Sequence, residues 1–344
     1  MNLERKSNDD STNTASQPGS LFVPTMTTLP LVITLEEHYV SPDLLAQRAV
    51  DDYSYVLPKL TNLGEERIKD MDAGSVTLQV LSHAAVNAPS LDLARSTNDK
   101  LSVAIEHHSK RLAAFAILPM ADPHDAADEL SRATKELYFV GALINNHLDG
   151  RFYDDPFFWP VFERAQELDV PIYIHPTFPS ENTKQQYEGN YPESTAYWLG
   201  IAGWGWHADT GLHILRLFAS GLFDKFPALK IIIGHMGELL PFQLDRIVPM
   251  SERWGKHERG LRQVWRENIW VTTSGMFSLA PLACLLHASP VEHIMFSIDY
   301  PFSSNETGQK FLEEVKKSGL VSEEDFEKIA YKNAERLLKV RAIE

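Results

Sequence analysis

The amino-acid sequence of 344 residues predicts an α/β fold, a TIM-like (β/α)8 barrel. Eight apolar runs that are typical of buried strands alternate with amphipathic segments. Four of these runs end in a histidine or a carboxylate, as expected where C-terminal strand ends meet in one bowl. The length also suits a barrel, which needs about 250 residues in one piece. The alternative fold is an open, doubly wound sheet, which more often has about six strands.

The predicted strands and helices alternate from residue 31 onward. The strands are expected at 31–37, 75–82, 112–119, 139–146, 170–176, 229–236, 268–275 and 293–299. Segments with apolar residues at three- and four-residue spacing lie between them, at 90–108, 124–137, 155–168, 210–223 and 307–317. Pro123, Pro156 and Pro281 stand where the first turn of a helix tolerates proline.

Three segments lie outside this alternation. Residues 1–29 are rich in Ser, Asn, Thr, Asp and Pro and are expected to be a disordered tail, which leaves 30–344 as the barrel. A long insertion at 177–209 follows the fifth predicted strand, and a segment of this length on the C-terminal face predicts a functional lid. Residues 322–340 predict two closing helices.

The composition excludes several classes of protein. The formal net charge is −15 and Lys and Arg never cluster beyond two in a row, which argues against nucleic-acid binding. Cys284 is the only cysteine, so a disulfide framework and a thiolate metal site are excluded. The first 25 residues contain no apolar run typical of a secretory signal or a membrane span. We therefore expect a cytoplasmic protein without membrane or nucleic-acid partners.

Polar side chains at the strand ends form a candidate metal site. They are Glu36, His38, His175, His235 and Asp299. Glu36 and His38 are two residues apart on an extended strand and should face the barrel interior, while Glu37 faces away. Taken singly, each residue also fits a structural role, such as a hydrogen-bonded core histidine or an N-capping aspartate. The combination favours a bound divalent cation, which would also attract an anionic substrate to an acidic protein.

Four motifs carry a resemblance to a known family. They are Leu35-Glu36-Glu37-His38, Ile174-His175-Pro176, Gly234-His235-Met236-Gly237-Glu238 and Asp299-Tyr300-Pro301-Phe302. In these the sequence resembles the nonoxidative decarboxylases of the amidohydrolase superfamily, such as the γ-resorcylate and 2,3-dihydroxybenzoate decarboxylases. The resemblance runs from about residue 31 to the C-terminus.

The resemblance implies one metal ion and its ligands. The ligands would be Glu36, His38, His175 and Asp299. His235 would lie just outside the metal's ligand shell, with Glu238 orienting it. Imidazole and carboxylate ligands suit Zn²⁺ and Mn²⁺ about equally, so either ion is expected. The first predicted strand lacks an H-x-H motif, and Asn145-Asn146 stand where binuclear relatives have a lysine, so a single metal is implied.

The resemblance also implies the reaction, a carbon–carbon lyase reaction that releases CO2 and a phenol from an ortho-hydroxybenzoate. The acid could be a dihydroxybenzoate, orsellinate or a methylsalicylate. Asp299 is the expected proton donor, with His235 and Glu238 behind it. Arg246 matches an arginine that in relatives reaches a substrate carboxylate, in some cases across a dimer interface; it also fits an ordinary solvated helix position. We expect a homodimer or a homotetramer.

Aromatic side chains are expected to pack against the substrate ring. The candidates are Phe302 and the tryptophans of the insertion, Trp198, Trp204 and Trp206. An aromatic side chain near a barrel mouth is core at least as often, and that alternative stays open.

Rival functions come from two classes. A mononuclear hydrolase of a lactone or amide is the main enzymatic alternative, although such hydrolases usually carry H-x-H on the first strand. A hydratase is a weaker option. An inactive barrel that serves as a binding scaffold is the non-enzymatic alternative, and metal analysis of the purified protein separates it from the others.

Overall fold

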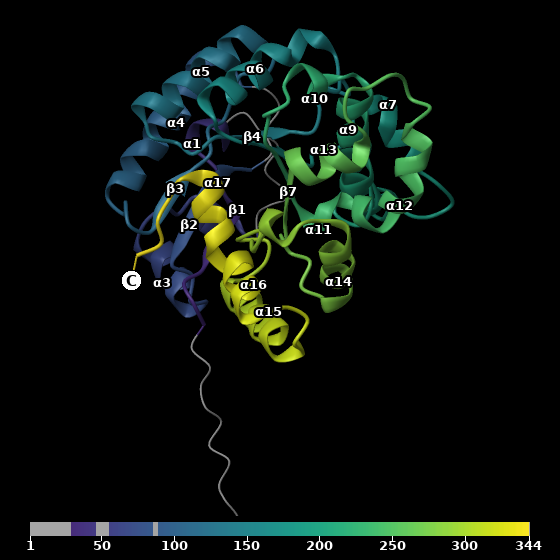
Figure 1. The fold of residues 1–344 in the computed structure, drawn as a ribbon. Coiled ribbons are helices and arrows are strands. Elements are labelled where there is room, and N and C mark those ends of the chain that lie inside the picture. The colour runs from purple at the N-terminus through teal and green to yellow at the C-terminus, as the bar shows by residue number, and fades with distance from the viewer. Residues whose placement is uncertain (1–28, 46–54, 85–88, 344) are drawn as a thin grey trace, which may run out of the picture.

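The structure is a computed structural model that describes residues 29–45, 55–84 and 89–343. The predicted tail at 1–29 therefore lies, except for Leu29, outside the described residues, and its disorder stays a prediction. Figure 1 shows strands enclosed by a ring of helices. The predicted barrel class is confirmed, and the open doubly wound sheet is not what the chain forms.

The strands of the described residues run parallel around the barrel. They are β1 (Ile33–Tyr39), β2 (Leu78–His83), β3 (Leu112–Ala114), β4 (Ala142–Asn145), β5 (Ile172–His175), β6 (Ile231–Ile233), β7 (Ile269–Thr272) and β8 (Ile294–Met295). Hydrogen bonds order them as β1-β2-β3 and as β4-β5-β6-β7-β8. A parallel bridge between Ala116 and Ala142 connects the two groups. Each strand overlaps a run predicted from the sequence.

Glu37 links β1 to the segment that follows β8. Its carboxylate accepts hydrogen bonds from the backbone N–H groups of Ile298 at 3.1 Å and Tyr300 at 3.0 Å. The backbone N–H of His38 donates to the Tyr300 carbonyl at 2.6 Å. The pairing of β1 with β2 shifts register between Thr34 and Glu37, and Glu36 has a φ of 62°. The middle of β1 is therefore irregular, whereas the sequence argument assumed a regular extended strand.

Side chains alternate between the inside of the barrel and the helical ring. On β5, Ile172 and Ile174 pack into the outer core with the helices, whereas Tyr173 packs into the inner core with Ile33 and Trp270. A strand buried on both faces reads as a continuous apolar run, which is why the sequence shows no polar alternation. His175, two residues after Tyr173, shares its inward side.

Helices cover the barrel and connect its strands (Figure 1). The longer ones are α3 (Glu65–Ala73), α4 (Leu91–Glu106), α5 (Pro123–Glu136), α6 (Trp159–Leu168), α9 (Gly205–Ala219), α12 (Leu240–Ser251), α13 (Leu261–Asn268), α14 (Leu279–Ala288) and α15 (Asn305–Ser318). Short turns are α1 (Pro42–Leu45), α2 (Leu57–Leu60), η2 (Pro156–Phe158), α10 (Leu222–Lys225), α11 (His235–Glu238) and η4 (Val291–His293). Pro123 and Pro156 each follow an N-capping aspartate, as their predicted first-turn positions require.

The insertion after β5 is largely helical. It contains α7 (Glu181–Lys184), η3 (Gln185–Tyr187) and α8 (Glu193–Gly200), and α9 begins at Gly205 rather than at the predicted residue 210. At the C-terminus, α16 (Glu323–Glu327) and α17 (Asn333–Leu338) flank a π-helical turn, η5 (Lys328–Lys332). Leu337 and Leu338 pack into the inner core of the barrel. Across the described residues, no helix combines the length and the apolar character needed to cross a bilayer.

Candidate metal centre and active site

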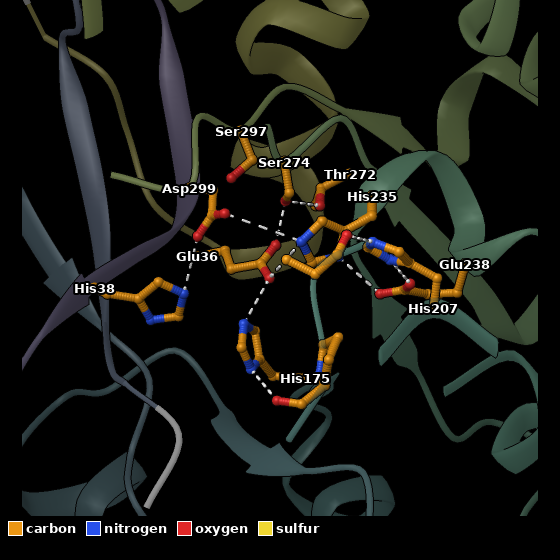
Figure 2. A network of polar contacts seen from close by, with 12 residues as sticks. Glu36, His38, His175, His207, His235, Glu238, Thr272, Ser274, Ser297 and Asp299 are labelled. Atoms are coloured by element: carbon orange, nitrogen blue, oxygen red, sulfur yellow. Dashed lines mark hydrogen bonds and ion pairs between the residues drawn. The ribbon is translucent and has the colours of Figure 1, made fainter. Parts of the chain in front are cut away.

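Three of the predicted metal ligands meet inside the barrel. Glu36, His38 and His175 are buried, and each offers one ligand atom within 4.8 Å of the others. Asp299 adjoins this cluster, with its Oδ1 3.3 Å from Nε2 of His38. In Figure 2 these side chains point toward one another from β1, β5 and the segment after β8. The structure thus brings residues from distant parts of the chain to one point.

Both histidines of the cluster turn their Nε2 atoms toward it. His175 Nδ1 lies 2.6 Å from the Pro176 carbonyl, which can only accept, so Nδ1–H donates and Nε2 keeps a lone pair. His38 Nδ1 lies 3.2 Å from the Ser82 hydroxyl. Nε2 of His38 and Oε1 of Glu36 are buried without a hydrogen-bond partner among the described residues. Buried polar atoms are rarely left unpaired, and a cation would satisfy both.

Neighbouring hydroxyls hold the other oxygen of Glu36. Tyr173 Oη and Ser274 Oγ donate to Oε2, and Thr272 Oγ1 contacts both hydroxyls, at 2.8 Å and 2.6 Å. Burial opposes ionisation of Glu36, but nearby imidazoles, with His235 the strongest, hold its pKa well below the usual range. The sequence argument missed these supporting residues, although Tyr173 stands two positions before His175, and Thr272 and Ser274 are likewise two apart.

The turn after β6 places His235 and Glu238. Every residue from His235 to Leu239 has a positive φ, between 49° and 91°. Only Gly237 in this stretch adopts such angles without a steric cost, and left-handed backbone in other residues clusters at functional sites. Gly234 serves a different purpose, since a Cβ there would stand 2.8 Å from Glu36 Oε2. Gly237 therefore permits the tight turn, and Gly234 permits the close approach to Glu36.

His235 and Glu238 form an ion pair beside the cluster. His235 Nδ1 lies 2.8 Å from Glu238 Oε1, and His207 Nδ1 lies 2.7 Å from Glu238 Oε2. Burial alone would lower the pKa of His235, but the carboxylates of Glu238, Glu36 and Asp299 raise it to about 10. Burial likewise opposes ionisation of Glu238, but the two imidazoles lower its pKa to about 2.

His235 adjoins the predicted metal ligands. Its Nε2 is 4.0 Å from both Glu36 Oε1 and Asp299 Oδ2. Nε2 of His235 thus faces the carboxylates of Glu36 and Asp299, and its place just outside the ligand shell stays a prediction. His207 was not singled out from the sequence, because nothing in its local pattern distinguishes it from other insertion residues.

A pocket opens above the cluster, largely walled by the insertion. It is lined by His38, Tyr55, Ala84, His175, Phe178, Tyr197, Trp198, Ile201, Ala202, Trp206, His235, Asp299 and Phe302. Phe302 contacts the His38 ring edge-on, with ring centroids 5.7 Å apart. Among the described lining residues none is Lys or Arg, so the pocket combines imidazoles and one carboxylate at its floor with apolar and aromatic walls.

Two predicted substrate contacts lie elsewhere. Trp204 is 54% exposed and lines a separate groove beside Tyr187, so among the insertion tryptophans only Trp198 and Trp206 reach the pocket. The expectation for Trp204 is wrong, because the start of α9 turns it outward. Arg246 is exposed on α12 and is not part of the pocket of its own chain. Its role stays a prediction.

The amidohydrolase family model matches residues 31–340, nearly all of the chain. The chain belongs to the amidohydrolase family. This agrees with the resemblance seen in the four sequence motifs.

Relatives of this amidohydrolase include decarboxylases. The chain is 50% identical over 323 residues to decarboxylase orsB of Emericella nidulans, covering 90% of the chain and 98% of that relative. It is 35% identical over 334 residues to a γ-resorcylate decarboxylase of a Polaromonas species, with the same coverages. A solved structure of a dihydroxybenzoic acid decarboxylase from Polaromonas, with bound manganese and the inhibitor 2-nitroresorcinol, superposes with a TM-score of 0.80. The two are 34% identical, and the match covers 90% of this chain and 97% of that structure's chain.

Proposed function

We propose that this amidohydrolase is a metal-dependent, nonoxidative decarboxylase of an ortho-hydroxybenzoate, a carboxy-lyase that releases CO2 and a phenol. The observation that carries the proposal is the buried cluster of Glu36, His38 and His175 at the floor of an aromatic pocket, in a chain that is 50% identical to a named decarboxylase. A dihydroxybenzoate, orsellinate or a methylsalicylate fits this class.

The cluster fits one divalent cation, Zn²⁺ or Mn²⁺. Glu36, His38, His175 and Asp299 would hold it, and the lack of a hydrogen bond from any described residue at Oε1 of Glu36 and at Nε2 of His38 supports that assignment. Imidazole and carboxylate ligands suit both ions. When bound, the cation supplies a Lewis acid and a template for the carboxylate and ortho hydroxyl of the substrate.

Asp299 is the proposed proton donor to the ring. Its carboxyl group borders the pocket, and its Oδ2 lies 4.0 Å from Nε2 of His235, whose pKa is raised by the neighbouring carboxylates, Glu238 first. A proton on Asp299 passes to the ring carbon that bears the carboxylate. The carbon–carbon bond then breaks, CO2 leaves, and the electron pair of the broken bond stays with the ring and restores its aromaticity. A general acid of this kind contributes about 10²–10⁴ in rate.

The walls of the pocket suit a flat aromatic ring. Phe302, Trp198 and Trp206 provide aromatic surface, while the polar groups lie together at one end. This arrangement orients the substrate with its carboxylate and hydroxyl toward the floor and its ring toward the insertion. The insertion thus acts as the lid that the sequence predicts, excluding water from the reacting carbon.

A panel of aromatic acids tests the proposed function. The metal-loaded enzyme is incubated with 2,6- and 2,3-dihydroxybenzoate, orsellinate and 6-methylsalicylate, together with benzoates that lack an ortho hydroxyl, and CO2 release and product mass are followed. Turnover of at least one ortho-hydroxy acid, with one metal per chain, supports the proposal. If instead ¹⁸O from water enters a product of unchanged carbon count from a lactone or amide, the enzyme is a hydrolase.

We further propose that the enzyme is a homodimer or a homotetramer whose interface includes α12. Leu239, Phe242 and Met250 are exposed large apolar residues, and Phe242 is 81% exposed. Phe242, Arg246 and Met250 follow a spacing of four and four residues along α12, which places them on one face of the helix, and Leu239 directly precedes it. A second copy of the chain would cover this apolar stripe and bring Arg246 to the pocket of its partner.

Mixing two inactive variants tests this arrangement. If Arg246 acts on the partner's substrate, Arg246→Ala and Asp299→Asn subunits that are unfolded and reassembled together regain about a quarter of wild-type activity, because mixed dimers contain one complete site. If Arg246 acts within its own chain, no mixed dimer contains a complete site and activity is not regained. A monomer in light scattering overturns the proposed assembly.

The remaining proposals concern the whole chain. We propose that residues 1–29 form a disordered tail on a barrel at 30–344, on the basis of their polar composition. We also propose a cytoplasmic location, supported by the single cysteine.

A further inference from the structure

His207 lies in the first turn of α9 and contacts Glu238, which lies in the turn after β6. We propose that His207 is a positioning residue that holds the Glu238 carboxylate and, through it, the imidazole of His235 in place for proton transfer. This inference rests on the proposed decarboxylation, and it assigns a role to a side chain that lies outside both the predicted ligand set and the walls of the pocket.

The two oxygens of Glu238 are held separately. Oε1 accepts from His235 Nδ1 at 2.8 Å and Oε2 accepts from His207 Nδ1 at 2.7 Å, as Figure 2 shows. Both lengths are typical of charge-assisted hydrogen bonds. The terminal torsion of a glutamate has a broad, roughly two-fold preference, so a carboxylate held at one oxygen can still turn. Anchored at both oxygens, Glu238 presents Oε1 to His235 in one orientation.

The other nitrogen of His207 ties it to the pocket wall. His207 Nε2 donates to the backbone carbonyl of Ala202 at 3.1 Å, and Ala202 is one of the pocket-lining residues of the insertion. The His207 ring also contacts the His235 ring edge-on, with centroids 4.7 Å apart. The imidazole of His207 therefore has a hydrogen-bond partner at each nitrogen. It connects the insertion at 177–209 to the pair formed by His235 and Glu238.

The orientation of His235 decides where its Nε2 points. With Nδ1 on Glu238, Nε2 faces Asp299 Oδ2 at 4.0 Å, the direction in which a proton would pass. A misplacement of about 1 Å near reacting groups can lower a rate by about 10²-fold. Release of Glu238 from His207 should therefore lower kcat, while substrate binding, which uses other residues, should change little.

A second metal ion is the competing explanation for this cluster. His207, His235 and Glu238 have ligand-type atoms within 4.8 Å of one another. However, each imidazole contacts the carboxylate directly, at 2.7 Å and 2.8 Å, so the three form hydrogen bonds rather than an open cage. Two ligands of one ion, each about 2.1 Å from it, usually stand farther apart than this.

Two matched substitutions separate the contacts of His207. In His207→Asn the amide lies at the position of Nδ1 and keeps the bond to Glu238, but the contact with Ala202 is lost. In His207→Gln the amide reaches the position of Nε2 and keeps the bond to Ala202, but Oε2 of Glu238 is released. Both variants are purified with metal, and their metal content and thermal unfolding are compared with those of the wild type.

The proposal predicts opposite outcomes for the pair. His207→Gln should lose about tenfold in kcat with KM within about twofold, in the range found when a supporting hydrogen bond at a metal site is removed. His207→Asn should keep kcat within about threefold of the wild type. The proposal is overturned if His207→Asn loses as much as His207→Gln, if the loss appears in KM instead, or if the wild type binds two metals per chain and His207→Gln binds one.

A spectroscopic measurement keeps this test independent of the substrate. In metal-loaded protein with ¹⁵N-labelled histidine, the Nδ1 resonance of His235 should shift in His207→Gln and stay near its wild-type position in His207→Asn. If the wild type turns over none of the acids and the resonance behaves in this way, the proposed reaction fails while the positioning role stands. A His235 resonance that is unchanged in both variants overturns the positioning role itself.

Discussion

Asp299 combines two demands that a single carboxyl group rarely meets. It lies 3.3 Å from His38 Nε2, beside the proposed metal ligands, and it also borders the pocket in which the substrate ring would lie. In the proposed mechanism, one oxygen holds the cation, the other carries the proton, and the nearby imidazole of His235 restores that proton. The sequence analysis assigned both roles to Asp299, and the structure adds that its two oxygens face different imidazoles, Oδ1 that of His38 and Oδ2 that of His235.

Asp299→Asn should lower kcat by at least about 100-fold, because an amide cannot deliver a proton although its oxygen can still coordinate. CO2 release under substrate saturation and the metal content of the variant are the measurements. Asp128→Asn, which changes an exposed carboxylate on α5, is the matched control and should equal the wild type. A tenth of wild-type activity remaining in Asp299→Asn would remove Asp299 as the donor.

A second residue-scale effect concerns stability. His213 on α9 is fully buried and accepts a hydrogen bond at Nε2 from the backbone N–H of Tyr153 at 3.1 Å. Burial lowers its pKa from 6.5 to about 3. Between these values the unfolded chain binds a proton that the folded chain does not bind. The contribution to stability is therefore complete above pH 6.5 and is lost as the pH falls toward 3.

Between pH 6.5 and pH 5, the titration of His213 should lower the free energy of unfolding by about 2 kcal/mol, at about 1.4 kcal/mol per pH unit. His213→Gln can still accept from Tyr153 but does not titrate, so its unfolding free energy should fall less steeply with acid. Denaturant unfolding at pH 7 and pH 5 provides the comparison, and the exposed His124→Gln should keep the wild-type slope. Equal slopes in all three proteins would assign the acid sensitivity to other groups.

At the scale of elements, the residues that follow the strands were predictable from the sequence. The positions of individual side chains within the insertion were not. Buried parallel strands are recognisable as apolar runs, and Glu36, His175 and Asp299 could be found because each follows such a run. Trp204 and His207 lie on the insertion, whose fold depends on packing against the barrel. The outward turn of Trp204 and the contact of His207 with Glu238 are long-range facts that local sequence does not carry.

The turn between β6 and α12 lies very close to the side chain of Glu36 on β1. Gly234 stands where any side chain would press on Glu36, since a Cβ would lie 2.8 Å from Glu36 Oε2 and 3.0 Å from Tyr173 Oη. Gly234→Ala should therefore displace the Glu36 carboxylate and weaken metal binding by about 10–100-fold. Competition with a chelator measures the affinity. Gly260→Ala, at a glycine with open space around it, is the control and should bind metal normally; equal affinity in both variants would contradict the assignment.

At the scale of the whole molecule, the barrel separates stability from chemistry. The inner core is closed by α17 at one end, and the polar groups of the candidate site lie near the C-terminal ends of the strands, beside the insertion. The site contains a left-handed turn and buried polar atoms without hydrogen bonds to the described part of the chain. The packing of the surrounding barrel offsets their energetic cost. The sequence could indicate the barrel because every strand obeys the same pattern, but the shape of the pocket arises from contacts between the insertion and the barrel.

The complete site makes one prediction about the order of events. The described pocket holds polar groups that can donate a proton, and the reaction needs neither an organic cofactor nor water as a reactant. If protonation of the ring precedes loss of CO2, turnover in D2O should place one deuterium at the carbon that carried the carboxylate. The same steps should run backward at high bicarbonate, carboxylating the phenol, because each is a reversible proton transfer or bond cleavage. Mass spectrometry and NMR of the products measure both. A product without deuterium at that carbon would mean that CO2 leaves by another route.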